Sequence, residues 1–144
     1  MTELSLDQAL KLAAAVLAEG RRIECSPLTV AVLDPGGHLR AFCREDGSGI
    51  LRPEIATGKA YGALGMGVGS RTLARLAEQR APFFGAVSTL AGGQVVPAAG
   101  GVLIRDGSGA LLGAVGVSGD ASDKDEACAV AAIDGLGLTA DPGR

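Results

Sequence analysis

Aromatic residues are almost absent from this 144-residue chain: they make up 3% of it, and there is no tryptophan. Alanine, valine and leucine must therefore build the core, and they bury less apolar area per residue than aromatic rings do. We expect such a chain to gain stability from contacts with further copies, so we predict a homo-oligomer. The shortage of rings also disfavours a nucleic-acid partner, which is often held by stacking on them.

An excess of basic residues and a long apolar run are missing as well. Thirteen basic and 16 acidic residues give a net charge of −3, which disfavours binding to a phosphate backbone. No apolar run approaches the ~20 residues that a membrane-spanning helix requires. The opening residues, Met-Thr-Glu-Leu-Ser, lack the basic start and apolar centre of a secretion signal. These absences predict a cytoplasmic protein that binds neither nucleic acid nor membrane.

Cysteine and histidine are equally scarce. The three cysteines, Cys25, Cys43 and Cys128, show no CxxC spacing, which argues against a disulfide framework and against a zinc site. They are most simply small apolar residues, and Cys43 has only a weak claim as a thiolate because Arg44 follows it. The single histidine, His38, lies in a short turn, so a Ser–His–Asp triad cannot be argued.

The remaining composition is that of one folded domain over residues 1–144. Hairpin-joined strands between helices predict an α+β fold with a five-stranded, mostly antiparallel sheet flanked by helices. Residues 141–144 are expected to form a frayed end. The predicted order is α-β-β-α-α-β-β-β-α: helix 6–21, strands 28–34 and 39–44, helices 54–66 and 70–80, strands 94–97, 102–105 and 111–117, and helix 122–136.

Glycine, by contrast, is abundant, and four glycines share one face at the predicted helix 54–66 and its end. Gly58, Gly62, Gly65 and Gly69 follow one another at helical spacing. Each interior helical glycine costs roughly 1 kcal/mol relative to alanine. We therefore expect this face to approach a sheet, a helix or a ligand very closely.

The stretch from Gly113 to Glu126 is predicted to run from a buried strand through a glycine turn into a helix. Such a junction gathers free backbone N–H groups and the Ser118 hydroxyl. Interaction with the helix dipole explains some of the acids that follow, but four are more than capping requires. One of them could act as a general base. Their spacing does not match an EF-hand loop, so no metal site is predicted. These acids are Asp120, Asp123, Asp125 and Glu126.

Lys59 is a lone cation among alanines and glycines on a helix that we expect to be buried. Burial requires either a structural carboxylate partner, such as Glu54, Asp125 or Glu126, or an anionic ligand. Arg52 precedes the same helix. Its guanidinium could hold a carboxylate with two hydrogen bonds, although a solvated loop arginine is the simpler interpretation. Tyr61 is most simply a packed ring with its hydroxyl hydrogen-bonded outward, and it could alternatively be an axial ligand or an acid/base group.

Several segments together resemble one known family. They are Val30–Leu39 (VAVLDPGGHL), Ala41–Gly47 (AFCREDG), Lys59–Tyr61 (KAY), Gly100–Leu103 (GGVL) and Gly113–Gly119 (GAVGVSG) followed by Asp125-Glu126. In this order, and over nearly the whole chain, they are similar to the GlcG/HbpS family of heme-binding-like proteins. That family includes the C-terminal domain of PduO-type cobalamin adenosyltransferases.

The resemblance implies a profilin-like antiparallel sheet, a homo-oligomer and, for some members, heme binding. The chain departs from those members because its first helix contains no histidine, so heme ligation from that helix is not carried over. Heme is nevertheless the cofactor that the resemblance suggests.

Two functions follow as hypotheses. In the first, the protein is a non-catalytic, oligomeric binding protein for a small molecule, heme or another tetrapyrrole included. The residues predicted to bind the ligand are His38, Arg52, Lys59, Tyr61, Gly100, Gly101, Ser118 and Gly119. In the alternative, it is a cofactor-independent isomerase, lyase or hydrolase that acts on a small anionic metabolite such as a carboxylate. Its catalytic residues would be Lys59, Asp125 and Glu126, with Ser118 near an oxyanion.

Overall fold

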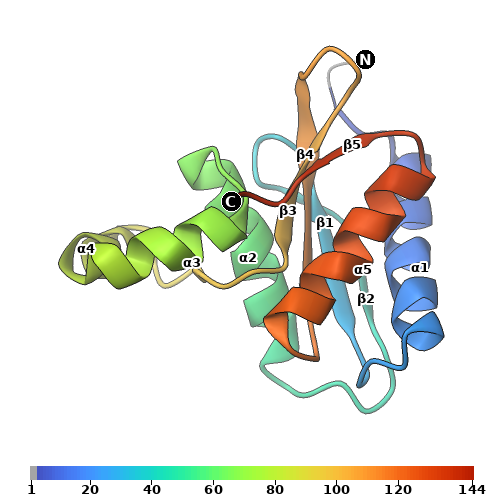
Figure 1. The fold of residues 1–144 in the computed structure, drawn as a ribbon, viewed down its shortest axis with the longest axis horizontal. Helices are drawn as coiled ribbons and strands as arrows, with labels where there is room; N and C mark the ends of the chain where they lie inside the picture. Colours follow the sequence, from blue (N-terminus) through green and yellow to red (C-terminus); the bar gives the residue numbers. More distant parts are fainter. Residues whose placement is uncertain (1–2) are drawn as a thin grey trace.

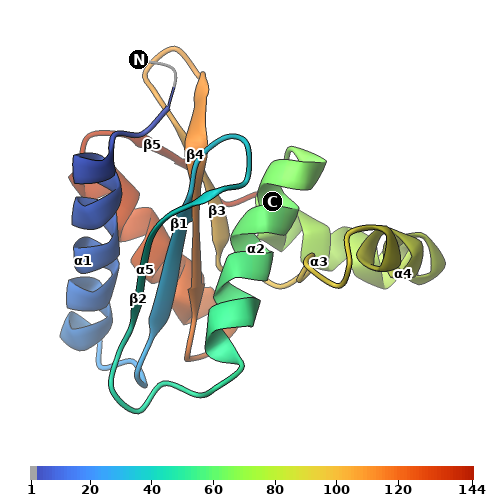
Figure 2. The same cartoon turned by 180° about the vertical axis from the view of Figure 1, so that it is seen from behind.

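A computed structural model describes residues 3–144. Ten elements follow one another along the chain (Figures 1 and 2). They are α1 (Leu6–Arg22), β1 (Thr29–Leu33), β2 (Leu39–Arg44), α2 (Arg52–Met66), α3 (Ser70–Gln79), α4 (Ala81–Leu90), β3 (Gly101–Arg105), β4 (Leu111–Ser118), α5 (Ser122–Gly135) and β5 (Thr139–Asp141).

The five strands form one antiparallel sheet in the order β2-β1-β4-β3-β5. Helices α1 and α5 lie side by side on one face, and α2 covers the other (Figures 1 and 2). The α+β class and the five-stranded antiparallel sheet predicted from the sequence are therefore confirmed. None of the helices within residues 3–144 is both long and apolar enough to cross a lipid bilayer.

Side chains of the central strands point alternately into two hydrophobic cores. On β1, Val30 and Val32 point into the larger core beneath α1 and α5. Leu33 instead joins the smaller core beneath α2, where it meets Ala60 and Ala63. Successive strand residues point to opposite faces, so an apolar strand such as β1 can be buried completely on both sides.

Local signals determine several helix ends. Ser5 and Gln8 form a capping box at α1, with the Gln8 N–H donating to the Ser5 hydroxyl at 3.1 Å. Pro53 lies in the first turn of α2, where its missing N–H costs nothing. Gly67 ends α2 with a φ of 74°, in the left-handed region that favours glycine.

The predicted strand 94–97 does not form. The Val96 N–H donates to the carbonyl of Gly58 on α2 instead of to a neighbouring strand, at 3.1 Å. The two glycines make this approach feasible: a Cβ on Gly58 would lie 2.5 Å from Val96, and one on Gly62 would lie 3.0 Å from Val95. The predicted close contact of the glycine face is confirmed at these two positions, but at Gly65 a Cβ would meet open space.

The fifth strand comes instead from the C-terminal end, where Ala140 of β5 pairs with Ile104 of β3. The residues beyond it do not fray. The carbonyl of Pro142 accepts from the Arg71 N–H at 3.2 Å, and the Arg144 N–H donates to the Thr72 hydroxyl at 2.7 Å. The tail thus provides hydrogen bonds for the start of α3, where no side chain caps the helix. Residues 81–90, expected to lie between elements, form α4.

Candidate functional site

A cavity of about 580 Å³ lies between α2, β2 and the turn after α4. Its volume falls within the range of roughly 300–1,000 Å³ that is typical of small-molecule sites. Most of its wall is apolar or backbone, and Glu54 and Tyr61 are its titratable side chains. The lining residues are Gly37, Leu39, Phe42, Pro53, Glu54, Thr57, Gly58, Tyr61, Gly92, Gly93 and Gln94.

Helical spacing on α2 brings one wall of the cavity together. Glu54, Thr57, Gly58 and Tyr61 recur at three- and four-residue intervals, so they lie on one face of the helix. The opposite wall is made by β2, an edge strand of the sheet. This strand leaves Leu39 54% exposed. Apolar side chains that would normally be covered are thus open to the cavity.

Tyr61 is half-buried in this wall and packs against the turn between β1 and β2. A Cβ on Gly37 would lie 3.0 Å from the Tyr61 ring, so glycine at this position makes room for the aromatic side chain. His38 follows in the same turn and is exposed, with its ring nitrogen 3.2 Å from the carboxylate of Asp34. The structure therefore places Tyr61 in the cavity and His38 one residue beyond a cavity-lining glycine.

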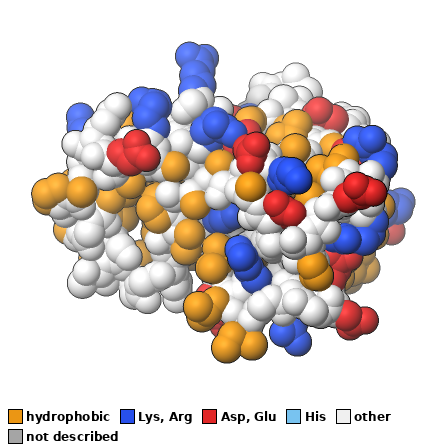
Figure 3. Space-filling view, turned by 60° about the horizontal axis from the view of Figure 1, so that its bottom comes forward, with side chains coloured by type: hydrophobic (Ala, Val, Ile, Leu, Met, Phe, Trp, Pro, Cys, Tyr) orange, Lys and Arg blue, Asp and Glu red, His pale blue; other side chains and the backbone are white. Residues whose placement is uncertain are grey.

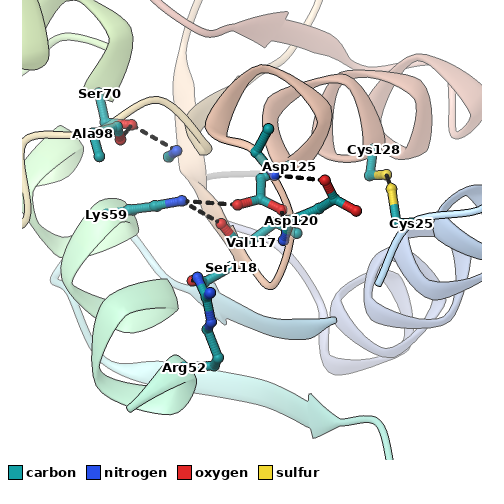
Figure 4. A network of polar contacts seen from close by, with 12 residues as sticks. Cys25, Arg52, Lys59, Ser70, Ala98, Val117, Ser118, Asp120, Asp125 and Cys128 are labelled. Atoms are coloured by element: carbon teal, nitrogen blue, oxygen red, sulfur yellow. Dashed lines mark hydrogen bonds and ion pairs between the residues drawn. The ribbon is translucent and has the colours of Figure 1, made fainter. Parts of the chain in front are cut away.

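A second cluster, which we call the polar network, lies at the end of β4 (Figure 4). The Lys59 ammonium donates to the carboxylate of Asp125 at 3.1 Å and to the Val117 carbonyl at 2.9 Å. The other Asp125 oxygen accepts from the Asp120 N–H at 2.9 Å. The Lys59 and Asp125 side chains are 3% and 1% exposed. The interpretation of Lys59 as half of a structural ion pair thus has a direct geometric basis.

Burial is the largest influence on the pKa values of Lys59 and Asp125. It lowers the pKa of Lys59 and raises the pKa of Asp125, because both charged forms lose hydration. The charge of each partner opposes the shift of the other, and the remaining hydrogen bonds also favour the ionised forms. Two buried ions that satisfy one another in this way are suited to holding two elements together.

Two hydroxyl groups extend the polar network. Arg52, at the start of α2, donates to the Ser118 hydroxyl at 3.0 Å. Ser70, at the start of α3, is buried, and its hydroxyl accepts from the Gly101 N–H and donates to the Ala98 carbonyl, both at 2.6 Å. Ser70 thus anchors the chain that enters β3.

The acids at the start of α5 have separate partners. Asp120 accepts from the Ser26 N–H at 2.8 Å, which ties the loop before β1 to this turn. Glu126 pairs with Arg71 of α3 at 2.8 Å. Within residues 3–144, no three His, Cys, Asp or Glu side chains gather as a metal site would require.

Buried sulfur atoms lie beside this network. The Sγ atoms of Cys25 and Cys128 are 3.9 Å apart, and both residues are buried as free thiols (Figure 4). Cys43 is only half-buried. Burial, followed by the neighbouring Cys25, raises the pKa of Cys128 to about 12. Cys25 and Cys128 therefore pack as small apolar residues.

The residues predicted to form one site fall into two groups. Two faces of α2 explain the division, because Lys59 faces the sheet whereas Tyr61 faces the cavity. Leu39 and Phe42 of the β2 wall are not among the site residues predicted from the sequence. Exposed apolar residues on an edge strand are the signal that could have identified them. The polar network holds Arg52, Lys59, Ser118 and Asp125, with Gly100 and Gly101 packed against Lys59; Gly119 adjoins it.

Proteins of known structure share this fold over nearly the whole chain. The heme complex of PduOC has a TM-score of 0.84 at 24% identity, covering 94% of this chain and 96% of that one. HbpS has a TM-score of 0.80 at 28% identity, covering 94% of this chain and 92% of that one. The ORFY protein of Klebsiella pneumoniae has a TM-score of 0.82 at 24% identity, covering 93% of this chain and 90% of that one.

Sequence comparison defines the family. An uncharacterized 15.0 kDa protein in the dhaT-dhaS intergenic region of Citrobacter freundii is 30% identical over 131 residues, which are 91% of this chain and 90% of that protein. The family described as "Haem degrading protein HbpS-like" matches residues 4–134. The chain belongs to this HbpS-like family, which confirms the resemblance seen in the sequence.

Proposed function

We propose that this protein is a cytoplasmic, oligomeric and non-catalytic binding protein for heme or a related tetrapyrrole. The observation that carries the proposal is the cavity between α2 and β2, in which apolar side chains surround Tyr61. Membership of the HbpS-like family and similarity to PduOC, which is known as a heme complex, support the choice of ligand.

The side chains in this cavity fit such a ligand. A tetrapyrrole needs an apolar slot, which Leu39, Phe42 and Pro53 provide. A bound heme would need a protein ligand for its iron, and a tyrosine oxygen serves as one in some heme proteins. Tyr61 is the residue we assign to this role. Bound heme would supply the coloured, redox-active iron, while the chain supplies enclosure and one oxygen ligand.

In this proposal the polar network holds α2 in place from the side that faces the sheet. None of Arg52, Lys59, Gly100, Gly101, Ser118 and Gly119 lines the cavity. Direct contact of these residues with a ligand stays a prediction, as does contact by His38. We infer that the Lys59–Asp125 pair acts by fixing the position of α2, the helix that carries Tyr61.

The enzyme hypothesis rests on the same pair. The 3.1 Å separation of Lys59 and Asp125 would suit proton transfer, and their pKa values are shifted in the direction that such chemistry uses. A substrate would have to reach them, however, and side chains that are 3% and 1% exposed offer it little surface. Glu126 is engaged with Arg71. These contacts favour a structural role over catalysis.

Titration of the purified protein with hemin tests the proposal. The wild type is expected to give a saturable Soret shift. Tyr61→Phe keeps the ring but removes the oxygen donor, so it should move the Soret band and weaken binding. Thr57→Trp should fill the cavity from the α2 wall and abolish binding. Ile50→Trp is the matched control, because Ile50 is 85% exposed and lies outside the cavity lining.

The proposal fails if the wild type shows no saturable shift. It also fails if Tyr61→Phe and Thr57→Trp both bind hemin with the wild-type spectrum and affinity. Circular dichroism of each variant verifies that the fold is retained.

A further inference from the structure

Within residues 3–144, helix α4 leaves an apolar stripe largely uncovered. Phe83, Ala86, Val87 and Leu90 lie at positions i, i+3, i+4 and i+7, which places them on one face of the helix. Phe83 is 52% exposed and Leu90 is 89% exposed. We call these four residues the α4 stripe. Amphipathic helices normally turn such a stripe towards a core, whereas here it points to solvent.

The remaining contacts of α4 are few. Helices α3 and α4 project away from the sheet, and α4 lies farthest from it (Figures 1 and 2). The element that α4 packs on is α3. Phe84 is the one buried residue of α4 within the described chain. An isolated helix of this length is unstable in water, so α4 depends on packing that its own chain supplies on one side only.

This region also carries no charge. The sequence contains no Asp, Glu, Lys or Arg between Arg80 and Arg105. In Figure 3 the lobe on the left shows orange and white atoms over most of its surface, with blue and red at its upper edge. Amphipathic helices that lie on membranes are usually rich in Lys and Arg on their polar face, and α4 has neither.

We propose that the α4 stripe is a self-association surface, on which a second copy of this chain docks through its own α4. Each copy has a net charge of −3, and a contact surface without charged side chains adds no like-charge contacts to the repulsion between two copies. The stripe is such a surface. Its spacing is that of a helix–helix seam, and an isologous contact requires each copy to present the same patch.

A stable interface must be larger than the α4 stripe, so we expect the contact to continue towards the cavity. A specific interface buries at least roughly 1,200 Å² in total, which is more than two short helices provide alone. The residues directly after α4 are Gly92, Gly93 and Gln94 at the cavity rim, and beyond them lie the exposed Leu39 and Phe42. The docked copy therefore covers the mouth of the cavity as well as the stripe.

The first experiment measures mass against protein concentration by analytical ultracentrifugation, without hemin. The wild type is expected to form dimers or a higher assembly built from them. Leu90→Glu should raise the dissociation constant by at least about 30-fold, since an apolar anchor of an interface contributes about 2 kcal/mol or more. Ile50→Glu is the control: it introduces the same charge at another exposed apolar position, so association should be unchanged.

The second experiment locates the contact on the helix. In a Cys43→Ser background, Ala86→Cys lies within the stripe, whereas Ala81→Cys lies on another face of the same helix and is also exposed. A short bis-maleimide should link two copies through position 86 and much less through position 81. Both variants should unfold at a denaturant concentration close to that of their parent.

The inference rests on the oligomer included in the proposed function but not on heme binding, so a failure to bind hemin leaves it standing and an oligomer unaffected by Leu90→Glu overturns it alone. A monomeric wild type at every concentration would overturn it. So would an oligomer whose mass is unchanged by Leu90→Glu, or equal cross-linking at positions 81 and 86. Binding of a monomeric wild type to anionic phospholipid vesicles, lost in Leu90→Glu, would assign the stripe to a membrane and would equally overturn the proposal.

Discussion

Lys59 and Asp125 join helices that cover opposite faces of the sheet. Their ion pair spans 3.1 Å from α2 to α5, and it passes the end of β4 at the Val117 carbonyl, to which Lys59 also donates. Removing two ions from water costs several kcal/mol each. The pair recovers that cost only because it is complete, with the Asp120 N–H satisfying the second carboxylate oxygen.

Removal of one partner should therefore destabilise the fold strongly. Asp125→Asn or Lys59→Met is expected to lower the free energy of unfolding by about 3–5 kcal/mol, because one buried group is left without its counter-charge. The double variant Lys59→Met/Asp125→Leu should lose much less than the sum of the two. Urea denaturation measures all three.

Glu126→Gln is the matched control for this ion pair. It removes a neighbouring carboxylate whose partner, Arg71, is 45% exposed, and solvent-screened pairs contribute only about 0–1 kcal/mol. If Asp125→Asn costs no more than Glu126→Gln, the Lys59–Asp125 pair does not hold the helices together.

Glycines on the two sides of α2 should respond oppositely to alanine. On the sheet below α2, a Cβ at Gly116 would overlap the Ala56 carbonyl oxygen, so Gly116→Ala must push the helix off the sheet. We expect a loss of about 3 kcal/mol, at the upper end of overpacking effects. Gly65→Ala adds a Cβ in open space on α2 and should stabilise the protein by up to about 1 kcal/mol.

Thermal and urea unfolding test this pair of substitutions together. A stabilising Gly116→Ala would show that α2 does not lie directly on β4. A destabilising Gly65→Ala would show that a neighbour occupies the space at that position.

Most of the fold could be predicted because local signals and periodicity agreed. The capping box at Ser5, the turn between β1 and β2 and the alternating core residues each determine structure within a few residues of themselves. The fifth strand could not be predicted, since β5 has three residues and is defined by pairing with β3. The segment 94–97 has strand-like residues, but its backbone hydrogen-bonds to Gly58 of α2 and not to a strand.

The candidate site was predictable only in part, for a similar reason. Burial of a lone lysine requires a partner, so the sequence alone predicts Asp125 as one of the candidates. Which face of α2 borders a cavity depends on where β2 and the 92–94 turn lie, and those are separated from α2 in sequence. Tyr61 and Lys59 are two residues apart and therefore face different surroundings.

Asp120 should make stability depend on pH under acidic conditions. Its hydrogen bond from the Ser26 N–H, followed by that from the Ala121 N–H, lowers the pKa of this carboxyl. A pKa that is lower in the folded state means that the unfolded chain binds the proton more readily. The stabilisation is then fully present above the ordinary aspartate pKa of about 3.9 and is lost as pH falls through the lowered value.

Comparison with Asp120→Asn isolates this contribution. The difference in urea midpoint between wild type and variant should be constant near neutral pH and shrink below about pH 4. Asp123→Asn, at an exposed position in the first turn of α5, controls for the loss of one surface charge. A difference that grows as pH falls would contradict the assigned hydrogen bonds.

The three cysteines should differ sharply in reactivity. A thiolate is the reactive form of cysteine, and burial, then the adjacent Cys25, raises the pKa of Cys128 to about 12. Cys25 is itself buried, and the 3.9 Å between the two sulfur atoms leaves both as thiols, because a disulfide bond spans about 2.05 Å.

Native protein treated with an aromatic disulfide reagent should therefore release one equivalent quickly, from Cys43. Cys43→Ser should remove that phase, and the other two thiols should react only at the rate of unfolding. Rapid labelling of Cys25 or Cys128 in folded protein, located by peptide mass spectrometry, would show that α5 opens far more readily than its packing against α1 implies.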